Sequence, residues 1–290
     1  MFESTADWAD PLLRISQRSF GRLAQFVNGE LGIKMPESKI PMIQSRLLRR
    51  VRALGLACID DYCEYLFSPS GARDERVHFI NAVTTNKTDF FREPGHFQYL
   101  AGQALPLLVN SGASARPGPL AVWSAACSSG EEPYTLAMVL SEYAAGCPGF
   151  DFRILATDIS TKVLQLAKEA VYSPHQIAPV PPALRRKYLL ESKAGGQRKT
   201  RVIPGLRRKV SFHRLNFMDQ DYRVRDLFDI IFCRNVLIYF DRPTQEAVIN
   251  KLCRNLAPGG FLFISHSETL SGLDVPLVSL GSSCYRRREE

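Results

Sequence analysis

Residues 123–134 constrain the fold of this chain more than any other segment. An apolar, strand-like run at 120–123 leads into a loop of small residues, and an apolar run at 134–140 without Gly or Pro follows as a helix. Pro133 suits the first turn of that helix. A strand-to-helix junction of this kind lets a ligand lie against the backbone, as it does in dinucleotide-binding folds.

Two carboxylates in this loop limit what the ligand can be. Dinucleotide-binding loops contain several glycines so that the backbone can approach a pyrophosphate, whereas this loop has only Gly130, followed by Glu131 and Glu132. Carboxylates at the start of a helix would repel a phosphate and would suit a ligand with an ammonium or sulfonium group. An ordinary capped helix start is the alternative interpretation of this segment.

A further acid follows at the end of the next predicted strand. Residues 153–158 form a short apolar run that ends in Asp158, and Ser160 is placed to cap the helix after it. An acid at the end of the second strand of a doubly wound sheet can accept both hydroxyls of a ribose, although helix capping alone is the alternative. The loop and the acid together predict a nucleoside ligand without phosphates, for which S-adenosylmethionine is the natural candidate.

Two more buried strands are predicted at 228–233 and 260–266, the second of which begins at a Pro-Gly-Gly turn. Ligands of such sheets lie beyond the carboxyl ends of the strands, so Asn235, Tyr239 and His266 are expected near one rim. Taken alone, Tyr239 would be interpreted as a core aromatic residue. For His266 a structural role is the preferred interpretation.

The first eighty or so residues have the pattern of helices. Apolar residues recur there at helical spacing, at Ile43, Leu47, Val51 and Leu54. Three arginines fall on another side of the same helix, namely Arg46, Arg49 and Arg50. Residues 34–53 and 185–214 have net charges of +5 and +10 in a chain whose net charge is +8, so the remainder is acidic. This localised charge favours steering of an acidic partner, and a solvated helix face is the alternative.

Five segments, in their order along the chain, resemble the chemoreceptor glutamate methyltransferases of bacterial chemotaxis, the CheR type. They are 84–93 (TTNKTDFFRE), 124–134 (SAACSSGEEPY), 156–159 (ATDI), 232–240 (FCRNVLIYF) and 265–268 (SHSE). The resemblance extends through almost the whole chain, and the five motifs together are highly specific. It implies an enzyme that uses S-adenosylmethionine and releases S-adenosylhomocysteine.

The resemblance also implies roles for single residues. Arg92 and Tyr239 match the two residues placed beside the transferring methyl group, and Asp158 matches the ribose ligand. Glu132 is preferred over Glu131 as the ligand of the methionine portion, with the alignment of this pair left open. The cofactor-binding set implied in this way is Asn86, Thr88, Arg92, Glu131, Glu132, Asp158, Asn216, Phe217, Arg234 and Asn235.

We therefore predict a chain of two domains. An all-α domain is expected at 1–83, with a linker to about 95, and an α/β domain at 96–290 with the doubly wound sheet of S-adenosylmethionine-dependent methyltransferases. By the same resemblance the substrates are glutamates on the cytoplasmic helices of chemoreceptors, and the chain is a monomer. The basic helix around Arg46, Arg49 and Arg50 is expected to contact those receptor helices.

Two antiparallel elements are expected within the α/β domain. A small β insertion is predicted at about 188–212, where Gly and Pro separate short alternating runs. The last strands, 278–280 and 283–286, are expected to form a hairpin at the edge of the main sheet. In the resembled family an inserted β subdomain can dock a peptide from the receptor's C-terminus by adding a strand, and the sequence leaves open whether this chain does so.

Methyl transfer to a glutamate requires few chemical groups in the active site. The acceptor carboxylate has an unperturbed pKa of about 4.3, so it is ionised at neutral pH and needs no general base. Catalysis then depends on alignment, which can lower the barrier by roughly 7 to 11 kcal/mol. Arg92 and Tyr239 are expected to orient the carboxylate, and Arg92 must not stabilise its ground state more than the transition state.

Composition excludes several classes of protein. A chain of 290 residues with 45% hydrophobic and 23% charged residues is an ordinary globular chain. It has no apolar run of about 18 residues and no leader-like start, so a soluble, cytoplasmic protein without membrane insertion is expected. Its seven cysteines show no C-x-x-C pair and no zinc spacing, so free thiols and no metal are expected.

Two other functions compete with this prediction. The net charge of +8 and the basic runs would suit a methyltransferase of nucleic acid. The sequence has Asn235-Val236-Leu237 where base amino-methylation uses Asn/Asp-Pro-Pro, and it lacks the Pro-Cys nucleophile of cytosine methylation, so no nucleic acid partner is expected. A cofactor-binding regulator without activity is the second alternative, against which the presence of Arg92 and Tyr239 argues.

Overall fold

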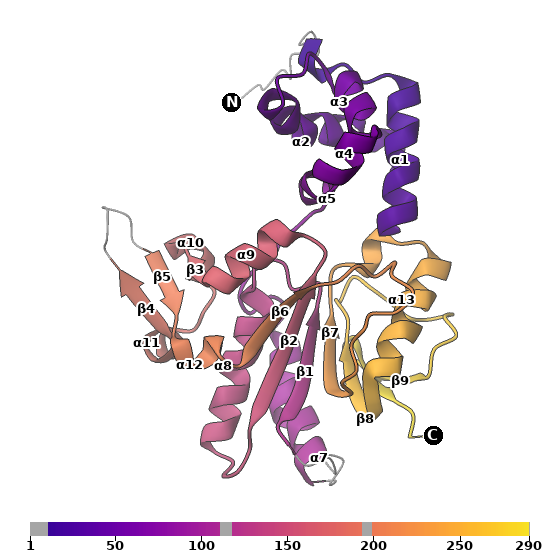
Figure 1. Cartoon of the computed structure of the whole chain (residues 1–290). Helices are drawn as coiled ribbons and strands as arrows, with labels where there is room; N and C mark the ends of the chain where they lie inside the picture. Colours follow the sequence, from indigo (N-terminus) through magenta and orange to yellow (C-terminus); the bar gives the residue numbers. More distant parts are fainter. Residues whose placement is uncertain (1–10, 111–117, 193–198, 290) are drawn as a thin grey trace, which may run out of the picture. The chain divides into compact units, whose positions relative to one another are not determined.

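The computed structural model describes residues 11–110, 118–192 and 199–289. The chain divides into two compact units, Met1–Thr85 and Asn86–Glu290 (Figure 1). An all-α unit precedes an α/β unit, which confirms the predicted fold class. Within the described ranges, no helix combines the length and the apolar composition needed to cross a bilayer.

The described part of the first unit is built from helices. They are η1 (Pro11–Leu13), α1 (Gln17–Leu31), η2 (Glu37–Lys39), α2 (Ile40–Ala53), α3 (Ile59–Leu66), α4 (Pro69–Asp74) and α5 (Arg76–Val83), of which η1 and η2 are 3₁₀ turns. The apolar stripe predicted for α2 is buried, since Ile43, Leu47 and Val51 are at most 1% exposed. Ser16 caps α1 by accepting from the Ser19 N–H, and Gly32 ends it with a φ of 68°.

A buried ion pair crosses this unit between α2 and the start of α5. The Glu75 carboxylate is 2% exposed and accepts from Arg50 Nε and Nη2 at 2.7 and 2.8 Å. The Tyr62 hydroxyl donates to the same carboxylate at 3.0 Å. The hydrogen bond and the charge of Glu75 raise the pKa of Arg50. Removing either member would leave a buried charge or a buried acceptor without its partner, so the pair has a structural role.

The other two arginines of α2 differ in how they are engaged. Arg46 donates to the Val83 carbonyl and, at 2.8 Å, to Thr85 Oγ1, so it ties α2 to the end of α5. Arg49 is exposed to solvent. Of the three arginines predicted to contact a partner, Arg49 is therefore the one whose guanidinium is not held by these internal contacts.

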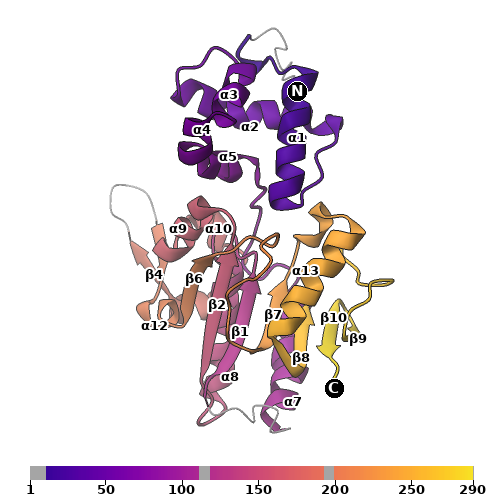
Figure 2. The ribbon, with the colours of Figure 1, turned by 45° about the vertical axis from the view of Figure 1, so that its right-hand side comes forward.

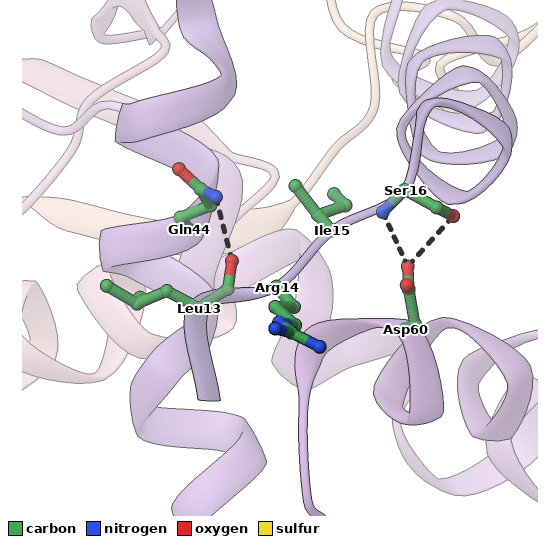
Figure 3. Close-up of a pocket in the computed structure, with 6 residues that line it drawn as sticks. All are labelled: Leu13, Arg14, Ile15, Ser16, Gln44 and Asp60. Atoms are coloured by element: carbon green, nitrogen blue, oxygen red, sulfur yellow. Dashed lines mark hydrogen bonds between the residues drawn. The ribbon is translucent and has the colours of Figure 1, made fainter. Parts of the chain in front are cut away.

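A small cavity of about 340 Å³ lies in the first unit (Figure 3). Its lining residues are Leu13, Arg14, Ile15, Ser16, Gln44 and Asp60. Gln44 donates to the Leu13 carbonyl at 2.7 Å, and Asp60 accepts from the Ser16 N–H at 2.8 Å. These polar groups hold the segment before α1 against α2 and α3, so they have a structural role in this unit.

The second unit is organised around one twisted sheet of seven strands, ordered β6-β2-β1-β7-β8-β10-β9. The strands are β1 (Leu120–Ala125), β2 (Phe152–Asp158), β6 (Val210–Arg214), β7 (Phe228–Cys233), β8 (Leu256–Phe263), β9 (Leu277–Gly281) and β10 (Cys284–Arg287). The first five in this order are parallel to their neighbours. The β10 strand is antiparallel to both β8 and β9, which confirms the predicted edge hairpin.

Helices cover both faces of this sheet. They are α6 (Pro94–Tyr99), the π-helical turn η3 (Leu100–Ala104), α7 (Leu105–Asn110), α8 (Glu131–Ala145), α9 (Thr161–Glu169), the 3₁₀ turn η5 (Leu237–Tyr239) and α13 (Arg242–Asn255). The α13 helix lies on one face, whereas α7 and α8 lie on the other (Figure 2). Such a two-sided cover keeps the central strands buried, and all six residues of β1 and of β7 are buried.

The antiparallel insertion has different bounds from those predicted. Its strands are β3 (Val171–Tyr172), β5 (Lys199–Val202) and β4 (Leu189–Ser192), in the order β3-β5-β4. The predicted range of 188–212 omits β3 and includes the first three of the five residues of β6, which pairs in parallel with β2 in the main sheet. The short strand β3 has too few residues to show an alternating pattern, and the basic, alternating sequence of β6 is that of an edge strand.

Short helices complete the insertion, namely α10 (Pro174–Ile177), α11 (Pro182–Tyr188) and α12 (Pro204–Arg207). An irregular segment at 215–227 then connects β6 to β7. A cavity of about 820 Å³ lies between this segment and β2, and the residues that line it include none of the predicted cofactor ligands. The Tyr222 ring packs edge-on against Trp123, with 6.0 Å between the ring centroids.

Candidate active site

The loop between β1 and α8 adopts a backbone that few sequences allow. Gly130 has a φ of +96°, and a Cβ on it would lie 2.9 Å from both Ala167 Cβ and the Tyr172 hydroxyl. Ala126 and Ser128 also have positive φ values, of 70° and 49°. Such conformations are costly for residues other than glycine and are retained where the surroundings hold them in place.

Hydrogen bonds from two other segments hold this loop. The Ser128 N–H donates to Asp158 Oδ2 at 2.9 Å, and the Cys127 N–H donates to the Thr157 carbonyl at 2.8 Å. The Ser128 hydroxyl donates to the Asn86 carbonyl at 2.8 Å. The loop is therefore joined to the end of β2 on one side and to the first residue of the unit on the other.

Asp158 lies at the carboxyl end of β2, as predicted. It is 7% exposed and also accepts from the Ser160 N–H at 2.9 Å. Burial raises the pKa of Asp158, and the backbone N–H groups of Ser160 and Ser128 oppose this shift. Ser160 caps α9 by accepting from the Val163 N–H, which confirms its predicted capping role. Asp158 is thus a fixed carboxylate directly beside the small-residue loop.

Glu131 and Glu132 point to different partners. Glu131 is 1% exposed and accepts from the Ser129 hydroxyl at 2.7 Å and from Gln176 Nε2 at 3.1 Å. Both of these donors are neutral. Burial raises the pKa of Glu131, and the two hydrogen bonds oppose the shift. Glu131 is therefore a buried carboxylate held by the uncharged side chains of Ser129 and Gln176.

Glu132 is joined to the end of β7. It accepts from the Ser124 hydroxyl at 2.7 Å and from Arg234 Nη1 at 3.1 Å. Burial raises the pKa of Glu132, and the charge of Arg234 is the largest effect that opposes it. Glu132 thus has a cationic partner, the Arg234 guanidinium, which it shares with Glu93.

Arg234 connects three segments of the site. Its side chain is 2% exposed, and its Nη2 lies 3.1 Å from Glu93 Oε2 and 2.5 Å from the Arg92 carbonyl. The guanidinium also lies 5.6 Å from the centroid of the Phe97 ring. Although burial alone would raise it, the pKa of Glu93 is lowered to about 2 by the Ser265 hydroxyl and by Arg234. This network of buried charges fixes the backbone of Arg92 relative to β7 and α8.

The predicted catalytic residues lie on two connections. Arg92 is half-buried, and its Nη1 donates to the Lys87 carbonyl at 3.1 Å. Tyr239 ends the 3₁₀ turn η5 and is half-buried. Asn235, with a φ of 58°, donates from Nδ2 to Ser265 Oγ at 2.6 Å. Arg92 and Asn235 are thereby linked through Glu93, since Ser265 Oγ donates to Glu93 at 2.7 Å.

The remaining predicted ligands occupy the ends of other strands. Asn216 follows β6 and accepts from the Met218 N–H at 3.0 Å. The Phe217 ring packs edge-on against Phe240, with 6.2 Å between centroids, so this segment adjoins the one that contains Tyr239. Thr88 is half-buried in the segment before α6.

Sequence reasoning missed several residues that support this site. Gln176, from α10 of the insertion, holds Glu131, and Tyr172 of β3 donates to the Ser129 carbonyl at 2.8 Å. The insertion therefore braces the small-residue loop from outside. A Ser-Pro sequence before Gln176 predicts a helix start, and Gln176 completes a capping box there, but no sequence pattern places it beside Glu131.

Glu93, His96 and His266 form a group whose potential metal-ligand atoms lie within 4.8 Å of one another. Glu93 Oε2 already pairs with Arg234 at 3.1 Å and accepts from the His266 N–H at 3.3 Å. A divalent cation bound to this oxygen would face the guanidinium charge, so the chemistry of the group does not suit a metal.

The donor set fits S-adenosylmethionine. A carboxylate with neutral donors can hold an amino group, a fixed strand-end acid can hold a ribose, and Gly130 lets the loop between them pack directly against Ala167 and Tyr172. The site has carboxylates at the position where dinucleotide-binding folds have phosphate-binding glycines, and it lies on a doubly wound sheet. These two features define the class of S-adenosylmethionine-dependent methyltransferases.

More narrowly, the chain belongs to the CheR methyltransferase family. Residues 86–284 match the CheR methyltransferase S-adenosylmethionine-binding domain, and residues 18–84 match the all-alpha domain of the same family. The cofactor is accordingly S-adenosylmethionine.

Two relatives cover nearly the whole chain. A probable chemotaxis protein methyltransferase of Rhizobium etli is 39% identical over 85% of this chain and 90% of its own length. A chemotaxis protein methyltransferase of Klebsiella aerogenes is 37% identical over 96% of this chain and 92% of its own length. Among solved structures, magnesium protoporphyrin IX methyltransferase of Synechocystis matches with a TM-score of 0.34 and 16% identity, over 77% of this chain and 94% of that one.

His96 predicts a loss of stability in acid. Burial and the nearby charges of Arg234 and His266 lower the pKa of His96 to about 4, and Glu93 partly opposes this shift. Because the unfolded chain takes up this proton near pH 6.5, it binds more protons than the folded chain between pH 6.5 and 4. Stability should therefore fall across that window, by roughly 1 to 2 kcal/mol between pH 6.5 and 5.

Urea unfolding of the full chain at several pH values measures this loss. The His96→Gln variant should lose that much less stability over the same window, whatever its stability at pH 7. The matched control is His213→Gln, at an exposed position on β6. Equal slopes for wild type and His96→Gln would contradict the assignment of this loss to His96.

Proposed function

We propose that this enzyme transfers the methyl group of S-adenosylmethionine to glutamate side chains of chemoreceptors in the cytoplasm. The products are glutamyl methyl esters and S-adenosylhomocysteine. The observation that carries the proposal is the buried Glu131 carboxylate, whose partners Ser129 and Gln176 are neutral, beside a loop fixed by Asp158. Membership of the CheR family and the names of the relatives, which are chemotaxis protein methyltransferases, support the receptor as substrate.

The resemblance to the CheR family implies a role for each cofactor residue. Asp158 accepts the ribose hydroxyls, because it ends β2 and backbone N–H groups hold both of its oxygens in place. Asn216 and Phe217 line the adenine end, and Asn86, Thr88 and Arg92 cover the cofactor. Arg234 and Asn235 are assigned to the methionine end, where Arg234 holds the backbone of Arg92.

We assign the amino group of the methionine portion to Glu131, not to Glu132. Glu132 already has the Arg234 guanidinium at 3.1 Å, whereas the side chains that donate to Glu131, Ser129 and Gln176, are neutral. A buried carboxylate with neutral donors gains more from a bound ammonium group than one that is already paired. Glu132 then acts through Arg234, which holds the backbone of Arg92.

Transfer requires alignment and no proton removal. The cofactor supplies a methyl group on a positively charged sulfur, and the acceptor glutamate is already ionised at neutral pH. Arg92 and Tyr239 orient the acceptor oxygen in line with that methyl group by hydrogen bonds. The hydroxyl of Tyr239 has no hydrogen-bond partner among the described residues, so it is available to a substrate. The network around Arg234 keeps this arrangement in place before the substrate binds.

The chemical nature of the product tests the function directly. Purified enzyme is incubated with methyl-labelled S-adenosylmethionine and receptor-bearing membranes, and the protein is then treated with mild alkali. Volatile labelled methanol is expected, because carboxyl methyl esters hydrolyse under these conditions. Alkali-stable label in the receptor would contradict esterification, and label in RNA added in a parallel sample would point to a nucleic-acid substrate.

Replacing Glu131 tests its assignment. Glu131→Gln should weaken S-adenosylmethionine binding roughly 10- to 100-fold, because a charge-assisted hydrogen bond of about 1.5 to 3 kcal/mol is lost. Isothermal titration of the full chain measures the Kd. Glu142→Gln is the control, since Glu142 lies on the same helix and pairs with Lys187 at the surface. An unchanged Kd in Glu131→Gln together with a weaker one in Glu132→Gln would transfer the assignment to Glu132.

The basic side of α2 is proposed as the receptor-binding surface, with Arg49 as its main contact. Arg46 and Arg50 contribute to the charge, but internal partners hold their guanidinium groups. Arg49→Glu is expected to lower receptor methylation several-fold, more at low than at high salt, with the Kd for S-adenosylmethionine unchanged. Arg50 is unsuitable for this test, because breaking a buried pair can cost about 3 to 5 kcal/mol.

Arg73→Glu provides the matched charge reversal for this test, since Arg73 is an exposed residue of the same unit. It should leave methylation nearly unchanged. Equal effects of Arg49→Glu and Arg73→Glu would show that general charge, and not the α2 surface, determines receptor binding.

A further inference from the structure

Glu268 is a buried carboxylate that the cofactor chemistry described above does not use. It is 9% exposed and lies between the ends of β7 and β8. Its oxygens accept from four backbone N–H groups. Oε2 accepts from Ser265 at 2.8 Å and from Asn235 at 3.1 Å, and Oε1 accepts from Val236 at 2.9 Å and from Leu237 at 2.8 Å.

Three of these N–H groups belong to the segment that leads to Tyr239. The turn η5 begins at Leu237, and the N–H groups at the start of a helical turn have no partner within the turn. Val236, which precedes the turn, has no side chain that could cap it. Glu268 supplies that cap from another strand end, 31 residues away in sequence from Leu237.

The same carboxylate holds Asn235 in an unusual backbone conformation. Asn235 has a φ of 58°, in the left-handed region, and its side chain donates to Ser265 Oγ at 2.6 Å. Glu268 accepts from the backbone N–H groups of both Asn235 and Ser265, so it joins the loop after β7 to the loop after β8. The position of Tyr239 thus depends on a carboxylate that lies outside its own segment.

We propose that Glu268 is a positioning residue for methyl transfer, whose carboxylate fixes the segment of Asn235 and Tyr239 in the orientation that the reaction needs. This inference rests on the proposed function, because that function gives Tyr239 its role in orienting the acceptor. Glu268 makes no contact with the reacting groups in this proposal.

Four N–H donors converge at this position, and the two oxygens of a glutamate carboxylate can accept from all of them. A glutamine has one acceptor oxygen, and its NH₂ group would face N–H donors instead of accepting from them. An aspartate is shorter by one methylene group and cannot reach both loops from the same backbone position. Glu268→Gln preserves the size of the side chain, so it removes the acceptor with little change in packing.

The test compares Glu268→Gln, Tyr239→Phe and the double variant in the full chain. Glu268→Gln should lower kcat for receptor methylation at least tenfold while the Kd for S-adenosylmethionine changes less than threefold. The double variant should be no slower than the slower single variant, because both changes remove the same orientation. Losses that multiply in the double variant, or an unchanged kcat in Glu268→Gln, would overturn the inference.

Glu246→Gln is the matched control, because Glu246 on α13 also accepts from a backbone N–H, that of Asp274 at 2.9 Å. It should leave kcat unchanged. If Glu268 has only a structural role, the Glu268→Gln variant will have a lower melting temperature and an unchanged kcat for its folded fraction. This result would also overturn the inference.

Hydrogen exchange provides a readout that does not require receptor methylation. In Glu268→Gln the amides of Asn235, Val236 and Leu237 should exchange at least tenfold faster, while those within β7 remain as protected as in wild type. Unchanged exchange at these three amides would refute the positioning role. If the wild type forms no alkali-labile methyl ester, the proposed function fails by itself, and the exchange result still decides what Glu268 holds.

Discussion

The buried guanidinium of Arg234 is the interaction on which the candidate active site depends. It joins Glu132 from α8, Glu93 from the segment before α6 and the Arg92 carbonyl, at distances between 2.5 and 3.1 Å. A buried charge of this kind is stable only when its partners compensate it, so the three segments are constrained together. Arg92 is thereby fixed through its backbone, while its side chain donates to the Lys87 carbonyl.

A second constraint connects the insertion to the cofactor loop. Tyr172 and Gln176 belong to the part of the chain that carries the small antiparallel sheet, and they hold Ser129 and Glu131 of the loop. The loop needs this support because Ala126 and Ser128 have left-handed backbone conformations. The insertion therefore stabilises the loop of the candidate active site, whether or not it also binds a partner.

Features governed by local periodicity could be predicted from the sequence. The strand that ends in Asp158, the cap at Ser160 and the buried stripe of α2 each follow from a few neighbouring residues, and each is present in the structure. The bounds of the insertion could not be predicted in this way, because the two-residue strand β3 is defined by its pairing with β5 and not by its own pattern.

Contacts between side chains that are distant in the sequence could not be predicted either. Arg50 has the spacing of a surface arginine, yet it pairs with the buried Glu75, which lies 25 residues further along the chain. Glu131 and Glu132 are adjacent and chemically identical, and only the structure shows that their partners differ. Helical geometry directs neighbouring side chains to different sides, and tertiary contacts then decide which carboxylate remains without a cation.

The central claim is that this site aligns an ionised carboxylate and removes no proton. The most direct measurement is kcat/KM for the receptor at saturating S-adenosylmethionine as a function of pH, from about pH 6.5 to 8.5, where the acceptor glutamate is ionised. A flat profile is predicted, because no step in this range requires a base to lose its proton. A rate that rises with an apparent pKa of about 7 would show that a group such as a histidine acts as general base, and it would contradict the claim.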